Sequence, residues 1–342
     1  MPIHTALCEL LNIRYPILQA PIGGLSTPAL VAAVSNAGGL GLLSVTWRKP
    51  DALRNLLRET RSLTSRPFGV NLVLPFDIEE RLDICLDEGV RIVSFFWGDP
   101  ARFIPRVHTA GGLVLHAVGS ASQGRSAVDA GADIVVAQGM EAGGHVCGEV
   151  GIMALVPCVV DAVAGTPVVA AGGIADGRGI AAALCLGAAG AMLGTRFVMS
   201  REANAHPDYQ AAIAAASETG TAYLENLFDR GWRNAPHRAL KNSTYRTWMD
   251  AGQPNRGARP AEDECIATLA DGGKVPRYSS DAPTRQVLMG LAEAMALYAG
   301  QGAGLIGDVR PAGEIVSELA AEAEAVLRDR LGYLRQRTPA GK

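Results

Sequence analysis

The chain has 342 residues, of which 48% are hydrophobic and 19% are charged, and its formal net charge is −3. A chain longer than about 250 residues accommodates one α/β barrel plus an appended segment, and this composition excludes a disordered chain or a small disulfide scaffold. The 31 basic and 34 acidic residues form no block of like charge, which argues against a nucleic-acid or membrane partner. We therefore expect a globular protein that binds a small molecule.

The cysteines and the N-terminal segment indicate the cellular compartment. Six cysteines are widely spaced and form no Cys-x-x-Cys pair. The first residues lack the charged and then apolar signature of a signal peptide, and apolar stretches such as 152–164 are too short to span a bilayer. We expect a reduced, cytoplasmic protein without a membrane segment.

Residues 15–200 alternate short apolar runs with amphipathic stretches of helical period. The apolar runs predict eight strands, at 17–20, 41–44, 68–73, 91–96, 113–118, 133–137, 167–171 and 191–194. Between them the pattern predicts helices, among them 28–37, 51–61, 79–88 and 121–130, and several are followed by a glycine that suits a left-handed cap. Eight such units in series predict an α/β fold, a (β/α)8 TIM barrel. An open doubly wound sheet is the second choice, but it needs a nucleotide fingerprint after the first strand, which is missing.

The alternation of apolar runs and amphipathic stretches ends at Ser200. Residues 201–283 are predicted to form a mostly helical insert near the barrel mouth, with the alternative that this segment only packs against the barrel. An apolar helix is expected over 283–298 and a surface helix over 313–337. Segment 284–342 would then complete a barrel built from residues 1–200.

The residues that follow the predicted strands are mostly amides, glycines and aromatics. Several carboxylates would be needed for a divalent metal and a lysine for a Schiff base, so we expect no metal and no Schiff-base chemistry. A planar neutral heterocycle suits these residue types. Gly172 and Gly173 after the seventh strand, with Gly194 and Thr195 after the eighth, predict a phosphate site, although glycines here can also be simple tight turns. The G-x-G-x-x-G run at 302–307 follows a helix rather than a strand, so we do not interpret it as a dinucleotide site.

The loop after the sixth strand, 138–145, combines an amide, a carboxylate and an imidazole with several glycines. His145 ends this glycine-rich loop, where an imidazole could exchange a proton with a ligand, so it is the candidate general base; a structural loop histidine is the alternative. His116 inside the fifth strand and His108 in a helix are interpreted as packed or surface residues. Cys147 has no apparent relay partner and is not interpreted as a nucleophile.

Six segments together resemble the nitronate monooxygenase family, formerly called 2-nitropropane dioxygenases. They are residues 19–24 (QAPIGG), 35–41 (SNAGGLG), 66–72 (RPFGVNL), 138–145 (QGMEAGGH), 170–179 (AAGGIADGRG) and 193–197 (LGTRF). Members of this family are FMN-dependent TIM-barrel enzymes. The resemblance therefore implies FMN as cofactor and covers most of residues 15–200.

The resemblance also implies the roles of individual residues. His145 would be the base, and the flavin contacts would come from Ala20, Pro21, Ile22, Asn71, Gln138, Gly143, Gly172, Gly173, Met192, Leu193, Gly194 and Thr195. The implied reaction takes a nitronate, or a nitroalkane deprotonated by the histidine, and passes electrons through FMN to O2, giving a carbonyl compound and nitrite.

Some residues depart from the pattern of many nitronate oxidisers. The chain has Phe96 where they often carry histidine, a different sequence follows His145, and the tail at 298–302 is closer to the quinone-reductase-like branch. An FMN-dependent NAD(P)H:quinone or enoyl-thioester reductase is therefore the alternative function, and a flavin-free barrel that binds a sugar or nucleotide phosphate is a third. Use of NAD(P)H and assembly as a homodimer are left open.

Overall fold

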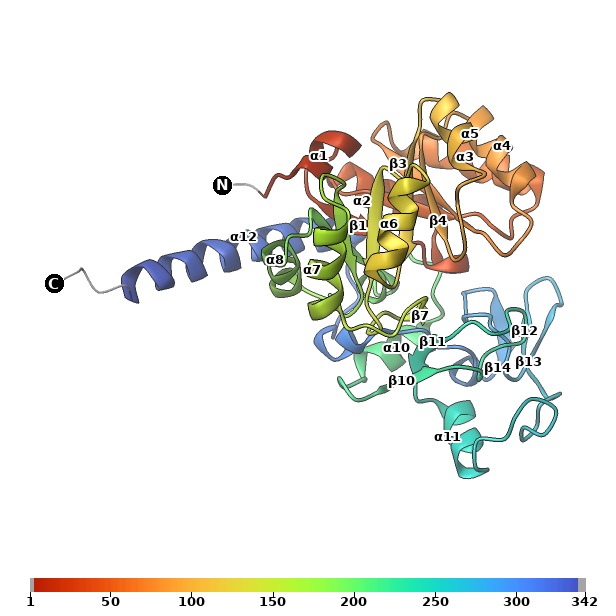
Figure 1. The fold of residues 1–342 in the computed structure, drawn as a ribbon. Helices are drawn as coiled ribbons and strands as arrows, with labels where there is room; N and C mark the ends of the chain where they lie inside the picture. The colour runs from red at the N-terminus through yellow and green to blue at the C-terminus, as the bar shows by residue number, and fades with distance from the viewer. Residues whose placement is uncertain (1–2, 338–342) are drawn as a thin grey trace.

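The computed structural model describes residues 3–337, with side chains up to residue 329. Eight parallel strands form a nearly closed barrel in the order β1-β9-β8-β6-β5-β4-β3-β2, and a bridge between Leu18 and Leu40 joins the two ends of the sheet (Figure 1). The barrel strands are β1 (Ile17–Gln19), β2 (Gly41–Ser44), β3 (Phe68–Val73), β4 (Ile92–Phe96), β5 (Leu113–Val118), β6 (Ile134–Gln138), β8 (Val168–Ala171) and β9 (Gly190–Leu193). The predicted barrel is confirmed, and each predicted strand end lies within one residue of the observed end.

Helices connect the barrel strands and cover the outside of the sheet. They are α2 (Pro28–Asn36), α3 (Pro50–Leu63), α4 (Glu79–Asp87), α5 (Ile104–Thr109), α6 (Ala121–Asp129), α7 (Ile152–Ala162), α8 (Gly177–Cys185) and α9 (Thr195–Val198), with a short 3-10 helix, η1 (Gly23–Leu25), after β1. Side-chain caps fix where some of them begin: Thr27 accepts a hydrogen bond from the Leu30 amide, and Asp176 accepts one from the Gly179 amide.

The barrel has an inner and an outer apolar layer. Leu18, Leu42, Leu115 and Val169 belong to a buried cluster that also contains residues of α1 (Ala6–Leu11). A second cluster joins the alternate strand residues, among them Val70, Val93 and Val135, to the surrounding helices. Because neighbouring strand residues point to opposite faces, every strand of this barrel is buried on both sides, as its continuous apolar sequence predicts.

The insert at 201–283 is not mostly helical, so that part of the prediction is wrong. It holds two helices, α10 (Pro207–Ala214) and α11 (Ser243–Asp250), and four strands, β10 (Thr221–Leu224), β11 (His237–Leu240), β12 (Cys265–Leu269) and β13 (Lys274–Pro276). The strands are only three to five residues long and lie between irregular loops. Strands this short carry too few residues for a period of two to stand out.

The helix predicted over 283–298 is also wrong. This stretch forms β14 (Val287–Gly290) and a 3-10 turn, η2 (Ala292–Ala294), and a further 3-10 helix, η3 (Gln301–Leu305), follows. Gly290 has φ of +112°, and a Cβ there would lie 2.2 Å from the carbonyl oxygen of Ile266 on the neighbouring strand. Its close pairing with β12 overrides the helix-forming residues around it.

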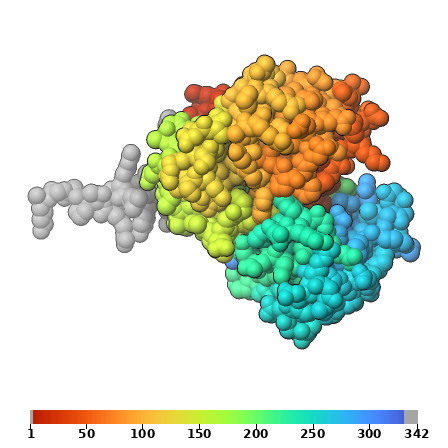
Figure 2. All heavy atoms as spheres, turned by 45° about the vertical axis from the view of Figure 1, so that its right-hand side comes forward, coloured from red at the N-terminus to blue at the C-terminus, as the bar shows by residue number. Residues whose placement is uncertain are grey.

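The predicted C-terminal helix is present as α12 (Ala312–Arg337), which packs against α8 and α2 and projects from the barrel beyond them. We call residues 201–311, between α9 and α12, the cap segment. Figure 2 shows it in teal and blue as a separate lobe against the orange and yellow barrel. Among residues 3–337, no helix is both long and apolar enough to cross a membrane.

Candidate active site

A cavity of about 620 Å³ lies at the carboxyl ends of the barrel strands, between the barrel and the cap segment. Twelve of the thirteen residues predicted for the site line it: Ala20, Pro21, Ile22, Asn71, Gln138, Gly143, His145, Gly172, Gly173, Met192, Gly194 and Thr195. Leu193 does not line the cavity. Its side chain is 1% exposed and packs in an outer apolar cluster, because it points to the opposite face of β9 from Met192.

The turn after β8 and the turn after β9 lie together in the cavity wall. Gly172 and Gly173 have φ of +108° and +70°, and a Cβ on Gly172 would lie 2.9 Å from the carbonyl oxygen of Gly139. Neither the Gly173 amide nor the Gly194 amide donates a hydrogen bond to another residue in the described part of the chain. Free backbone N–H groups in a glycine turn are suited to bind an anion such as a phosphate.

Two amide side chains, from strands β3 and β6, have different tasks. Asn71 is 4% exposed, and its Oδ1 has no hydrogen-bond partner among the described residues, so it is available to a ligand donor in the cavity. Gln138 holds the loop that follows it: its Nε2 donates to the carbonyl oxygen of His145 at 3.1 Å, and its Oε1 accepts from the Cys147 amide at 3.3 Å. Gln138 therefore fixes the backbone that carries the candidate base.

His145 lies on the short strand β7 (Gly144–His145), which pairs with β11 of the cap segment so that His145 is opposite His237. Its ring stacks on the indole of Trp232, with centroids 4.1 Å apart and planes at 28°. Burial, with a smaller contribution from His237, lowers the pKa of His145 to about 3. Its Nε2 is buried and has no hydrogen-bond partner among the described residues. The imidazole is thus neutral at physiological pH and has an open acceptor or donor position.

The two other histidines considered in the sequence analysis, and Cys147, lie outside the cavity. His116 is buried in β5, and its burial lowers its pKa to about 4. His108 bonds Asp133 at 2.9 Å on the barrel exterior. Burial raises the pKa of the Cys147 thiol to about 11, and this thiol donates to Gln138. A thiol with so high a pKa is a poor nucleophile, which agrees with the interpretation made from the sequence.

Sequence reasoning missed most of the residues that the cap segment brings to the cavity. They include the side chains of Arg230, Trp232, Asp281 and Tyr298 and the backbone of Gly300 and Gly302. The Gly300 amide donates to Thr195 Oγ1 at 3.0 Å, so the segment after Tyr298 is fixed directly to the turn after β9. The resemblance of the tail at 298–302 to the quinone-reductase-like branch could have indicated part of this wall. Nothing in the sequence pattern identified Trp232.

The fold and the cavity define a (β/α)8-barrel enzyme, with its site at the carboxyl ends of the strands. The chain belongs to the nitronate monooxygenase family, because the family model described as "Nitronate monooxygenase" matches residues 4–80 and 76–322. The chain is therefore an enzyme of an oxidoreductase family. Among the described residues no group of His, Cys, Asp and Glu side chains is arranged to hold a metal ion.

Relatives of known name match nearly the whole chain. A (3aS,4S,5R,7aS)-5-hydroxy-7a-methyl-1-oxo-octahydro-1H-indene-4-carboxyl-CoA dehydrogenase of Mycobacterium tuberculosis is 33% identical, over 94% of this chain and 97% of that protein. A nitronate monooxygenase of Pseudomonas aeruginosa is 34% identical, over 92% of this chain and 97% of that protein. The family is thus clear, while the named reactions of the relatives differ.

Two solved structures are also similar over nearly the whole chain. FabK from Thermotoga maritima is similar with a TM-score of 0.81 and 35% identity, over 97% of this chain and 99% of that chain. A nitroalkane oxidase from Streptomyces ansochromogenes is similar with a TM-score of 0.76 and 31% identity, over 96% of this chain and 100% of that chain.

Proposed function

We propose that this protein is an FMN-dependent oxidoreductase that oxidises alkyl nitronates with O2 to a carbonyl compound and nitrite. The observation that carries the proposal is the shared cavity: a neutral imidazole, His145, lines the same cavity as the free amides of the turns after β8 and β9. Membership of the nitronate monooxygenase family supports it.

The residues of the cavity fit FMN. The amides of Gly173 and Gly194 would hold the phosphate, and the buried, unpartnered Oδ1 of Asn71 would accept a hydrogen bond from an N–H of the isoalloxazine ring. The backbone of Ala20 to Ile22, which lines the cavity, would lie against that ring. When bound, FMN supplies the electron transfer between the organic substrate and O2.

The protein's own contribution is binding, orientation and a place for a proton. His145 Nε2 is the group that would take a proton from a nitroalkane or donate a hydrogen bond to a nitronate oxygen. A base with a pKa of about 3 has little driving force to deprotonate a neutral carbon acid. We therefore expect preformed nitronates to be better substrates than nitroalkanes.

A second candidate is an FMN-dependent reductase of a quinone or of an enoyl thioester, driven by NAD(P)H. The aromatic side chains of Trp47, Phe76, Phe96 and Trp232 in the cavity wall favour it, because a small nitronate needs less apolar surface. The likeness to a CoA dehydrogenase over 94% of the chain also points to a thioester substrate.

Anaerobic flavin reduction separates the two functions. The protein as purified, loaded with FMN, is mixed in a stopped-flow instrument with propionate 3-nitronate or with NADH, and flavin absorbance is followed. Rapid bleaching by the nitronate with slow bleaching by NADH is the expected result. The reverse order would favour the reductase, and a protein that binds no flavin would contradict both.

His145→Asn tests the role of the imidazole. If His145 is the base, turnover of a neutral nitroalkane should fall by roughly 10²–10⁴, while turnover of the preformed nitronate falls much less. FMN content should be unchanged, because the phosphate is held elsewhere. His108→Gln on the barrel exterior is the matched control and should leave both rates unchanged. Equal losses on the two substrates would assign His145 to binding rather than to proton transfer.

A further inference from the structure

Trp232 closes the part of the cavity that lies over His145. Beyond the stack on the imidazole, its indole makes edge contacts with three aromatic rings, Phe76 at 5.4 Å, Trp97 at 5.2 Å and Phe96 at 6.3 Å between centroids. Trp97 has a left-handed φ of +64° that is rare for an aromatic residue. The barrel thus supplies an aromatic enclosure at the ends of β3 and β4, and the cap segment fills it with one indole.

The same indole helps to bury the reactive edge of the candidate base. Besides Trp232, the rings of His237 and Tyr298 surround His145, with centroids at 5.6 Å and 5.5 Å. His237 is held in β11, where its Nε2 accepts from the Phe228 amide, and the Tyr298 hydroxyl donates to the Ser280 carbonyl oxygen. Water does not reach His145 Nε2 in this arrangement. Of the three covering rings, only Trp232 stands on a loop without such a bond.

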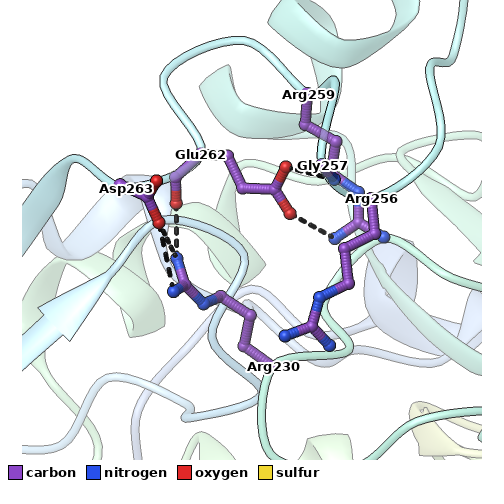
Figure 3. Close-up of a pocket in the computed structure, with 6 residues that line it drawn as sticks. All are labelled: Arg230, Arg256, Gly257, Arg259, Glu262 and Asp263. Carbon is purple, nitrogen blue, oxygen red and sulfur yellow. Dashed lines mark hydrogen bonds and ion pairs between the residues drawn. The ribbon is translucent and has the colours of Figure 1, made fainter.

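The loop of Trp232 is anchored at its base and unbonded at its tip. At the base, Arg259 forms a buried pair with Asp229 at 2.7 Å. Arg230 donates to the Glu262 carbonyl oxygen at 2.6 Å and to Asp263 at 3.3 Å (Figure 3). Residues 231–234 form a local turn and make no hydrogen bond to any other segment of the described chain. Only side-chain packing holds the tip, so it can move without breaking the base.

These observations lead to one proposal, which rests on the proposed function for the identity of the reaction. We propose that Trp232 is a positioning and specificity-determining residue: its indole occupies the subsite for the apolar body of the substrate, which displaces it and so uncovers His145 Nε2. The substrate would then carry an alkyl or acyl chain large enough to replace the indole against Phe76, Phe96 and Trp97. A small nitronate would displace the indole less readily and should therefore be a poorer substrate than a longer one.

The first test reads the imidazole directly and needs no turnover. Histidine ¹⁵N resonances of the FMN-loaded protein are titrated in the wild type and in Trp232→Ala, and His145 is assigned with His145→Gln. Removing the indole should raise the pKa of His145 from about 3 toward its ordinary value of 6.5. The titratable groups that still face it are His237 on β11 and Tyr298, while Arg230 and Asp281 line the same cavity.

Two further variants keep this test decisive. Trp232→Phe retains an aromatic cover and should give a smaller shift in the same direction, which guards against a Trp232→Ala protein that does not fold. Trp248→Phe alters a buried tryptophan of α11 that is not part of the cavity wall and should leave the His145 titration unchanged. A pKa of His145 that stays unchanged in both Trp232 variants would overturn the proposal.

The second test compares substrates of increasing chain length. For Trp232→Ala, the ratio of kcat/KM for a long-chain nitronate to that for ethyl nitronate should fall at least tenfold. The preference for the long chain is lost because the substrate no longer has to displace the indole. An equal loss on every substrate would make Trp232 a packing residue only. If no nitronate is turned over by the wild type, the proposed function fails, while the titration still decides whether Trp232 covers the base.

Discussion

The barrel and the cap segment contribute to the same cavity in different ways. The barrel presents mainly backbone, the glycine turns after β8 and β9, together with Asn71 and Gln138 at strand ends. The cap segment presents large side chains, Trp232 and Tyr298, against the face of His145. Groups suited to a shared cofactor thus lie on the regular part of the fold, and groups suited to select the substrate lie on the irregular part.

The two regions also differ in what stabilises them. The barrel buries continuous apolar strands between two hydrophobic layers. The cap segment has two small apolar clusters of its own, and other residues of it, such as Tyr209 and Ile213, join a cluster shared with the barrel. Arginine ion pairs add to them, and the side chain of Arg259 is only 1% exposed. We therefore expect the cap segment to open before the barrel, and variants in each region can test this difference.

The largest effect is expected from Arg259→Met. It leaves the carboxylate of Asp229, with a side chain 10% exposed, without its cation and should lower the free energy of unfolding by about 3–5 kcal/mol. Hydrogen exchange should show faster exchange in β10 and β11, with β4 and β5 still protected. Arg256→Met changes an exposed arginine of the same loop and should alter stability by no more than about 0.5 kcal/mol. Faster exchange in barrel and cap segment alike would contradict a separate opening of the cap segment.

A smaller loss of stability, but a direct effect on the cofactor, is expected from Gly172→Ala. The added Cβ meets the Gly139 carbonyl oxygen in a backbone conformation that suits glycine, which should cost about 1–3 kcal/mol and weaken FMN binding at least tenfold. Gly165→Ala is the matched control: its φ is also positive, at +91°, but its Cβ meets nothing within 4 Å. It should cost about 1–2 kcal/mol and leave FMN binding unchanged, as fluorescence titration of the apoprotein would show. Equal FMN affinity in both variants would show that the turn after β8 is not part of the cofactor site.

The sequence predicted the barrel because each strand there is buried on both faces and each helix has an amphipathic period. Position along the barrel then placed His145 and the glycine turns at one edge of the sheet, since parallel strands all end there. Leu193 was assigned to the cavity because the whole turn was carried over from the family, although the alternation of β9 directs this side chain outward.

The cap segment could not be predicted in the same way. Its strands pair across long loops, as in β12 with β14, so the decisive contacts lie far apart in the chain. Trp232 stands in a stretch without period or motif, and its position depends on the distant pair between Arg259 and Asp229. A local pattern cannot reveal such a pairing, so sequence reasoning predicted the candidate base but missed the residue that covers it.

The barrel and the cap segment each contain a buried histidine, His116 on β5 and His237 on β11. Burial lowers the pKa of His116 to about 4 and also lowers that of His237. Each imidazole is thus neutral in the folded state, whereas the unfolded chain takes up a proton near pH 6.5. Below that pH the unfolded state binds more protons, so stability falls as the pH decreases. For His116 the loss should approach about 2 kcal/mol between pH 7.5 and pH 5, and His237 should contribute a loss in the same direction.

Urea unfolding at the two pH values measures this loss. His116→Gln should reduce the difference between pH 7.5 and pH 5 by about 2 kcal/mol, because one proton uptake by the unfolded chain is removed. His4→Gln, at an exposed position near the N-terminus, should leave the difference unchanged. If the cap segment opens first, acid should also accelerate hydrogen exchange in β11, which carries His237, at a pH where β5, which carries His116, is still protected. Simultaneous loss of protection in the two strands would mean that the barrel and the cap segment unfold as one cooperative unit.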